Sequence, residues 1–527
     1  MEKSKYMAAI DLGSSNVVVA VGSRATDGRV EIEEIVISPS AGVTCGEVKN
    51  VESAAASIRK AVGLMEDRLG IKITEAYTGI SGNHIRCAKH PYFVFVANRD
   101  GEISREDVRK LNESMRNLQA PQGYKLMHII PQHYVVNDDE EVMDPVGRFG
   151  KTLGSTFNLI IGEDTPITRH EKAFQKVEIK QSKLYINPLA MAEAVTFPDE
   201  KELGVAVVDI GAGTTDVTIY HDGIVRNVIV IPMGADAINK DIRSYGIMER
   251  YVEELKVGYG CAVAEMVDAE KLVKIPGRTP NDHKDISFRN LASIIEARMV
   301  DIINYVVDEI KDSGYEGRLG AGIVLTGGAS RLKEIKTLFE RKTGIEVRLA
   351  DPNILITEES KAKVDENPAA AVAVGILWQG MNSGVESKVS VRKEPQAEPQ
   401  AGAGGGATIN DVYRNQQGGA GHSAEQPGGG RKPVFEGDEE EDNGRRSWWG
   451  GRKKTKEKPP KKEKTAKRRD YDEEDDLGPD MWGDDEPRRS GFMGKLKNKL
   501  NKAIDLDVLD DDDTNVTDGE GRYEQRR

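Results

Sequence analysis

The fold of this chain is decided by a short pattern that occurs twice, as Ile10-Asp-Leu-Gly-Ser-Ser-Asn16 and as Val208-Asp-Ile-Gly-Ala-Gly-Thr-Thr-Asp216. Each copy follows one apolar, β-branched run and precedes another, which predicts a strand, a tight turn and a second strand. A single Asp-x-Gly is typical of an ordinary strand-end turn. Two copies in the same context, one in each half of the chain, instead indicate two related hairpins.

Turns of this composition suit the binding of phosphate. Glycine lets the backbone approach an anion and adopt positive φ, and successive N–H groups form an anion-binding concavity. An aspartate at each strand end can hold hydrated Mg²⁺, which takes one or two carboxylates plus phosphate oxygens. We therefore expect two facing loops around one polyphosphate, with Asp11 and Asp209 near the metal. The residues expected to contact phosphate are Gly13, Ser14, Ser15, Asn16, Gly211, Gly213, Thr214 and Thr215.

A third turn, Ile323-Val-Leu-Thr-Gly-Gly-Ala-Ser330, follows an apolar strand and precedes a predicted helix. Backbone without side chains would let a flat nucleoside lie against Gly327, Gly328 and Ala329, and a helix N-terminus favours nearby anions. A simple β–α turn remains an alternative interpretation. The small residues of the helix over 368–375 indicate close helix packing.

Outward from the two hairpins, alternating strands and helices predict a layered α/β architecture. The segment over 83–162 departs from this alternation of strands and helices. It has a capped helix from Ser104 to Leu118 and a strand over 125–136, and we interpret it as an inserted subdomain. Strands are expected over 6–11, 17–21, 30–37, 73–79, 203–210, 216–220, 224–231 and 322–325. Helices are expected over 51–69, 237–244, 249–257, 291–311, 331–341 and 368–379.

Composition separates the front of the chain from a long tail. The chain has 527 residues and a net charge of −14, which argues against a nucleic-acid binder. Its three cysteines have no metal-ligand spacing, which argues against a disulfide framework and a zinc site. The longest apolar run is far shorter than a membrane span, so we expect a soluble, intracellular protein that touches a membrane only from one side. From residue 384 onward, 28 basic and 32 acidic residues predict a disordered tail.

One periodic segment interrupts the tail at 491–506. At 100° per residue its apolar side chains fall on one arc with lysines at the border, a pattern typical of helices that lie on an anionic membrane. Docking on another protein is the alternative. The basic block over 445–469 is either a second membrane or nucleic-acid contact or a solvated spacer. The residues expected to bind the membrane are Phe492, Met493, Leu496, Leu500, Ile504, Lys495, Lys497, Lys499 and Lys502.

The sequence resembles the bacterial cell-division FtsA family, within the superfamily of actin, Hsp70 and sugar-kinase ATPases. The likeness covers about residues 6–380. It rests on the two phosphate loops and on Gly79-Ile-Ser-Gly82, His128-Ile-Ile-Pro-Gln-His-Tyr134, Asp144-Pro-Val-Gly147, Lys256-Val-Gly-Tyr-Gly-Cys-Ala262 and Gly322-Ile-Val-Leu-Thr-Gly-Gly328.

This resemblance implies an actin-like two-lobed fold with ATP and Mg²⁺ in the cleft, in a protein that is at most a slow ATPase. Such proteins polymerise and anchor the FtsZ ring to the cytoplasmic face of the inner membrane at the septum, where later division proteins are recruited. The region over 236–317 would contact FtsZ. Glu253 and Lys256 would approach the ribose, unless they form only an exposed salt-bridged helix face. His133 stands where relatives usually have a carboxylate.

The alternative function is a small-molecule kinase or phosphatase of the same superfamily. A kinase needs a positioned aspartate base, and the sequence has no clear spare carboxylate in an inserted catalytic loop. The expected organisation is a first lobe over 1–82 and 163–203, an insert over 83–162, a second lobe over 204–235 and 318–383 with an outer subdomain over 236–317, a linker over 384–490, an amphipathic helix over 491–506 and an acidic terminus over 507–527.

Overall fold

The computed structural model describes residues 6–391, except 138–139, 278, 280–282, 351, 353, 366–367 and 385–388. Most of the predicted linker over 384–490, the predicted membrane helix over 491–506 and the acidic terminus over 507–527 lie outside the described residues. Within the part of the chain that is described, no helix is both long and apolar enough to span a bilayer.

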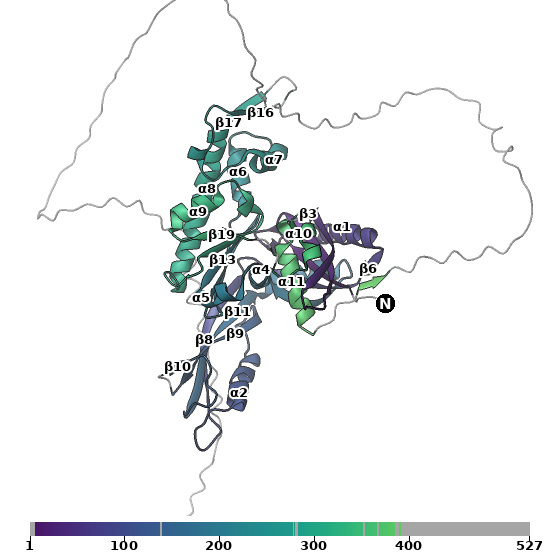
Figure 1. Ribbon diagram of the computed structural model, residues 1–527. Helices are drawn as coiled ribbons and strands as arrows, with labels where there is room; N and C mark the ends of the chain where they lie inside the picture. The colour runs from purple at the N-terminus through teal and green to yellow at the C-terminus, as the bar shows by residue number, and fades with distance from the viewer. Residues whose placement is uncertain are drawn as a thin grey trace, which may run out of the picture. The chain divides into compact units, whose positions relative to one another are not determined.

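Two five-stranded sheets with the same topology form the centre of the fold (Figure 1). In each, three antiparallel strands are followed by two parallel strands: one pairs with the first strand of the trio, and the last pairs with that added strand. The first sheet has the order β12-β7-β1-β2-β3, with β1 (Met7–Leu12), β2 (Asn16–Arg24), β3 (Val30–Pro39), β7 (Glu75–Ile80) and β12 (Lys180–Ile186). The second has the order β15-β14-β13-β18-β19, with β13 (Val205–Ile210), β14 (Thr215–His221), β15 (Ile224–Ile231), β18 (Ile323–Thr326) and β19 (Val347–Leu349). The repeat predicted from the two hairpins is therefore a repeat of whole lobes.

Helices cover both faces of the first sheet. Because side chains alternate along a strand, Ala8 and Ile10 join one buried cluster with α1, while Ala9 joins another with α11. Gly375 lies so close to α4 that a Cβ there would meet the Ala190 carbonyl oxygen at 2.0 Å, which confirms the predicted close packing. The helices of this lobe are α1 (Val51–Leu69), α3 (Asp164–Gln175), α4 (Asn187–Val195), α10 (Lys361–Asp365) and α11 (Ala371–Asn382).

The second lobe adds an outer subdomain built on α8. The helices of the whole second lobe, including this subdomain, are α5 (Pro198–Leu203), α6 (Ala235–Ser244), α7 (Glu249–Tyr259), α8 (Phe288–Ser313) and α9 (Ile335–Thr343). The subdomain also contains a hairpin of β16 (Leu272–Pro276) and β17 (His283–Ser287). Two predicted boundaries are wrong. Leu203 ends α5 instead of opening a strand, and the helix expected from Arg331 begins only at Ile335, after a 3₁₀ turn over Gly328–Arg331.

The insert is a four-stranded antiparallel sheet with one helix on a face. Its order is β10-β9-β11-β8, with β8 (Ile85–Phe95), β9 (Tyr124–Val136), β10 (Glu140–Val142) and β11 (Thr152–Glu163). The helix α2 (Arg105–Arg116) begins at the predicted cap: Ser104 and Asp107 form a reciprocal capping box.

Short strands complete the described chain. One pair is β4 (Val43–Thr44) with β5 (Glu47–Val48), and the other is β6 (Ile71–Ile73) with β20 (Val389–Val391). Because β20 pairs with the first lobe, the linker predicted to start at 384 is wrong at its beginning.

Candidate functional site

A cavity of about 450 Å³ lies between the two lobes. Both hairpin turns and the Gly327-Gly328 turn line it, together with α7 and the start of α6. Of the predicted polyphosphate and nucleoside residues, the cavity is lined by Asp11, Gly13, Ser14, Ser15, Asn16, Asp209, Gly211, Gly213, Thr214, Glu253, Lys256, Gly327, Gly328 and Ala329. The tertiary structure thus brings together four segments that are far apart in sequence.

The two hairpin turns have the same hydrogen-bonded geometry. The Gly13 N–H donates to the Asn16 carbonyl at 3.0 Å, and the Gly211 N–H donates to the Thr214 carbonyl at 2.9 Å. The turns also touch each other, since a Cβ on Gly213 would lie 2.4 Å from Ser14 Oγ. A side chain at that position would push the lobes apart, so glycine is required there by close approach.

Thr215 is the predicted phosphate residue that the structure places elsewhere. Its side chain is fully buried, and its hydroxyl donates to the Met233 carbonyl at 2.8 Å. Side chains alternate along β14, so Thr214 and Asp216 face the cavity while Thr215 points into the core. Its register equivalent in the first hairpin is the buried Val17.

Three buried carboxylates lie at this cavity. Burial raises the pKa of Asp11 to about 6, against a hydrogen bond from Asn187 that lowers it. Burial and the charges of Asp216 and Asp11 raise the pKa of Asp209 to about 8. Burial also raises the pKa of Asp216 to about 7, although the hydroxyls of Ser81 and Thr214 donate to it. A cation bound nearby would favour the ionised form of these carboxylates and lower their pKa values.

Asp216, Asn187 and Ser81 are cavity residues that sequence reasoning missed. Asn187 Nδ2 donates to Asp11 Oδ1 at 2.8 Å, and Ser81 Oγ reaches across from the first lobe to Asp216 Oδ2 at 2.7 Å. Asp216 could have been predicted from the sequence, because it lies two residues beyond Thr214 on the same strand face. Ser81 lies in the Gly79-Ile-Ser-Gly82 motif but was given no role there, and nothing in the local sequence marks Asn187. Only the tertiary fold brings the two side chains to the hairpins.

Gly327 is fixed by its contact with a predicted metal residue. It has φ +88°, and a Cβ on it would lie 2.1 Å from Asp209 Oδ1 and 2.7 Å from the Ile210 carbonyl oxygen. The strand β18 adds in parallel to β13, which carries Asp209 to the side of this turn. Gly327 therefore permits the third turn to lie directly against the second hairpin, whereas a Cβ on Gly328 would meet open space.

Glu253 and Lys256 form a salt bridge on α7, and their predicted role at the ribose stays a prediction. Both line the cavity, and Lys256 Nζ donates to Glu253 Oε2 at 2.8 Å. Asn239 Nδ2 also donates to Glu253, at 2.7 Å, and the Lys256 side chain is buried. The pair is a salt bridge at the cavity wall, with the lysine buried and the glutamate exposed.

The start of α6 holds the second hairpin in place. The N–H groups of Ala235 and Asp236 donate to the carbonyls of Gly211 and Ala212, at 2.9 and 2.8 Å. These donors are therefore engaged by the protein, and they fix the loop conformation.

Comparisons with known proteins agree with this geometry. The family model described as "Cell division protein FtsA" matches residues 206–375, and the model described as "SHS2 domain inserted in FTSA" matches residues 82–161. The latter range nearly coincides with the four-stranded insert.

The chain is also similar to curated proteins over most of its length. It is 32% identical over 405 residues to the cell division protein FtsA of Pseudomonas aeruginosa, covering 76% of this chain and 96% of that protein. It is 29% identical over 401 residues to the FtsA of Escherichia coli K12, covering 75% of this chain and 94% of that protein.

Among solved structures, the PilM-PilN type IV pilus biogenesis complex matches with a TM-score of 0.50 at 15% identity, covering 71% of this chain and 98% of that one. At that identity the likeness concerns the fold alone. The two repeated lobes, the inserted subdomain and the similarity to full-length relatives lead to one conclusion: this chain has an actin-like fold and belongs to the FtsA family of cell-division proteins.

Proposed function

We propose that this protein binds ATP with Mg²⁺ in the cavity between its lobes and uses it to assemble into filaments on the cytoplasmic face of the membrane. The observation that carries the nucleotide proposal is the pair of matching turns that meet at one cavity, with Asp11 and Asp209 at equivalent positions. The Gly13–Asn16 and Gly211–Thr214 turns would contact the phosphates. Gly327, Gly328 and Ala329, with Glu253 and Lys256, would hold the nucleoside.

The donor set fits a hydrated Mg²⁺. Burial raises the pKa values of Asp11, Asp209 and Asp216, and Asp216 Oδ1 has no hydrogen-bond partner. Within the described residues, no three acidic, histidine or cysteine side chains converge closely enough to hold a metal alone. Mg²⁺ takes one or two carboxylates together with phosphate oxygens and water, so it would be held by these aspartates and the bound phosphate together. When bound, Mg²⁺ would neutralise phosphate charge beside these carboxylates.

Isothermal titration calorimetry of the full chain tests the nucleotide proposal. We expect Mg·ATP to bind the wild type, and Asp11→Asn or Thr214→Val to weaken binding at least tenfold, the loss of about 1.4 kcal/mol. Arg109→Gln, on the exposed face of α2 in the insert, is a matched control that should leave the affinity unchanged. A wild type that takes up no adenine nucleotide in the presence of Mg²⁺ would contradict the proposal.

We further propose that the protein tethers a division ring to the membrane through its terminal segment. The support is membership of the FtsA family and the apolar arc of Phe492, Met493, Leu496, Leu500 and Ile504 with its lysine border. A single short helix of this kind binds weakly, so attachment would depend on many copies in a filament.

Co-sedimentation with anionic liposomes tests tethering, with zwitterionic liposomes as the comparison. The full chain should pellet with anionic lipid in the presence of ATP, and a variant ending at Ser490 should not. Equal pelleting of the two would refute the membrane role. Electron microscopy of the same samples tests assembly, because monodisperse particles with every nucleotide would refute filament formation.

The partner proposed for the outer subdomain over 236–317 is FtsZ, with later division proteins joining the assembly. Co-sedimentation with FtsZ polymers, comparing wild type with charge reversals on the exposed side of α6 such as Arg243→Glu, measures this contact. Binding unchanged by several reversals over this subdomain would place the contact elsewhere. A phosphate-transfer assay with sugar and carboxylate acceptors tests the alternative kinase function.

A further inference from the structure

The insert belongs to the first lobe by sequence, yet it docks on the second. The strand β15 is an edge of the second sheet, and its outer side faces the insert strands β8, β9 and β11. Gln132 Nε2 donates to the Val225 carbonyl at 3.0 Å, and Asn158 Nδ2 donates to the Arg226 carbonyl at 2.8 Å. Side-chain amides of the insert thus satisfy backbone carbonyls that an exposed edge strand would leave unpaired.

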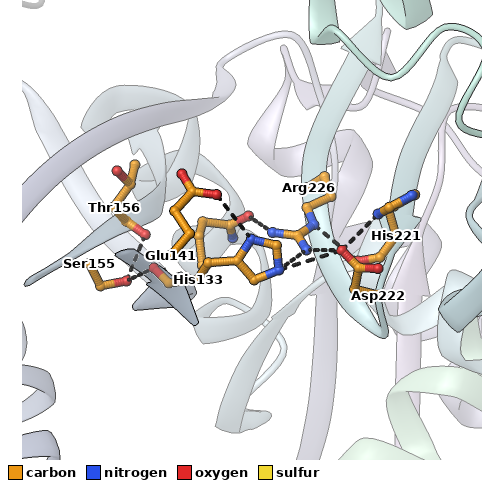
Figure 2. A network of polar contacts seen from close by, with 8 residues as sticks. His133, Glu141, Ser155, Thr156, His221, Asp222 and Arg226 are labelled. Carbon is orange, nitrogen blue, oxygen red and sulfur yellow. Dashed lines mark hydrogen bonds and ion pairs between the residues drawn. The ribbon is translucent and has the colours of Figure 1, made fainter. Parts of the chain in front are cut away.

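Arg226 is the centre of this junction, as Figure 2 shows. Its side chain is 3% exposed, and its Nε donates to the carbonyl of His221 at 3.0 Å. Nη1 donates to Gln132 Oε1 at 3.1 Å, and Nη2 donates to Asp222 Oδ2 at 2.9 Å. If these partners moved away, the free-energy cost would exceed that of a single lost hydrogen bond, because the buried charge of the guanidinium would remain uncompensated.

His133 completes the arrangement from the insert side (Figure 2). Its Nε2 lies 2.9 Å from Arg226 Nη2 and 3.4 Å from Asp222 Oδ2, so the ring lies against both members of the Arg226–Asp222 ion pair. Nδ1 in turn faces Glu141 Oε2 at 3.9 Å. The histidine that departs from the usual carboxylate of this family therefore keeps a contact with the second lobe.

The same strand leads from Arg226 to the phosphate-binding turn. At its far end Ile231 pairs with Thr215, whose hydroxyl holds the Met233 carbonyl, and two residues later Ala235 donates to Gly211. A strand is stiff along its length, so a shift of the Gly211 turn moves the β15 end that carries Arg226. One continuous element therefore connects the cavity with the docking surface of the insert.

We propose that the Arg226 junction couples occupancy of the cavity to docking of the insert, so that nucleotide binding regulates the position of the insert and the insert regulates nucleotide affinity. This inference rests on the proposed nucleotide function and adds its regulation. Coupling of binding free energies is reciprocal: if the nucleotide favours the docked insert, undocking the insert weakens nucleotide binding by the same factor.

The test uses the full chain with Arg226→Met, which keeps the length of the side chain and removes its donors, and Gln132→Leu, which breaks the junction from the insert side. Each variant should raise the Kd for Mg·ATP at least fivefold, the lower end of typical coupling. The double variant should be no weaker than the weaker single variant, because both disrupt one junction. Arg318→Met is the matched control, since Arg318 also lies over the Tyr315 ring but is exposed and outside the network.

Hydrogen exchange measured by mass spectrometry gives a readout that does not depend on nucleotide turnover. Peptides from β9 and β15 should exchange faster in both junction variants than in the wild type, and Mg·ATP should slow their exchange only in the wild type. Peptides from α1 should be unchanged, which shows that the variants are folded.

Two results would overturn the inference. Exchange in β9 and β15 that is the same in variants and wild type would mean that Arg226 does not hold the insert. Faster exchange with a Kd within twofold of the wild type would mean that docking and binding are independent. A wild type that binds no nucleotide would instead refute the proposed function and the coupling with it, while the exchange of the variants without nucleotide still reports whether Arg226 holds the insert.

Discussion

Asp209→Asn is expected to stabilise the nucleotide-free protein while abolishing the binding of Mg·ATP. Burial and two neighbouring carboxylates raise the pKa of Asp209 from 3.8 to about 8. An asparagine has nearly the same shape and carries no charge, so it relieves the repulsion in the empty cavity. The same change removes a carboxylate that would hold the proposed Mg²⁺.

The magnitude depends on pH in a defined direction. Well below pH 3.8, Asp209 is protonated in both the folded and unfolded states and contributes nothing to their difference. As pH rises toward 8, the unfolded state ionises while the folded state keeps its proton, so this group lowers the free energy of unfolding by up to about 1.4 kcal/mol per pH unit. Between pH 6 and 8 the wild type should therefore lose about 2–3 kcal/mol relative to Asp209→Asn, and above pH 8 the difference should level off.

Urea unfolding of both proteins at pH 6, 7 and 8, with a chelator present, measures this difference. Asp308→Asn changes an exposed carboxylate of α8 and is the control. A gap between wild type and Asp209→Asn that stays constant within about 0.5 kcal/mol over this range would refute the electrostatic reasoning. Repeating the series with Mg·ATP should reverse the order of stability, because only the wild type gains from binding.

Three further predictions follow from the geometry. Gly375→Ala should destabilise the protein by about 2–4 kcal/mol in urea unfolding, since its Cβ would clash with backbone. Gly63→Ala, in open space on α1, should instead stabilise it by about 0.5–1 kcal/mol. Equal effects of the two variants would contradict the packing argument. Thr215→Val should leave the Kd for Mg·ATP within threefold and lower stability by about 1 kcal/mol, in contrast to Thr214→Val, and an affinity loss at Thr215 would restore it as a ligand. Ser81→Ala should speed release of a fluorescent ATP analogue about tenfold in stopped flow by removing the bond across the lobes; an unchanged rate would show that this bond does not hold the cavity closed.

Much of the local structure followed from sequence because local rules governed it. The helix over 51–69 has the predicted bounds, with the Asn50 side chain capping its start and Gly70 in the left-handed conformation at its end. Ser104 and Asp107 form the predicted capping box. Both hairpins were predictable because the glycine pattern and the flanking β-branched runs determine turn and strand within a few residues.

The wrong predictions concern residues whose conformation or orientation depends on contacts with distant parts of the chain. Leu203 belongs to α5, because the chain enters β13 only after the turn at Gly204, which no local pattern marks. β20 pairs with β6, more than 300 residues earlier, although its surroundings have linker composition. Thr215 looked equivalent to Thr214 until the register of β14 placed it on the core face.

By itself, the sequence determined that two hairpins of one design exist, which residues form their turns, and that a charged tail with an apolar-and-lysine segment follows. Those features depend on residues adjacent along the chain, where backbone conformation and side-chain periodicity act. Only the tertiary structure decided that the two turns touch, that Ser81 and Asn187 complete the carboxylate group, and that the insert docks through Arg226 on the opposite lobe. These contacts join residues tens to hundreds of positions apart, and their energies depend on burial and charge that exist only once the lobes have packed.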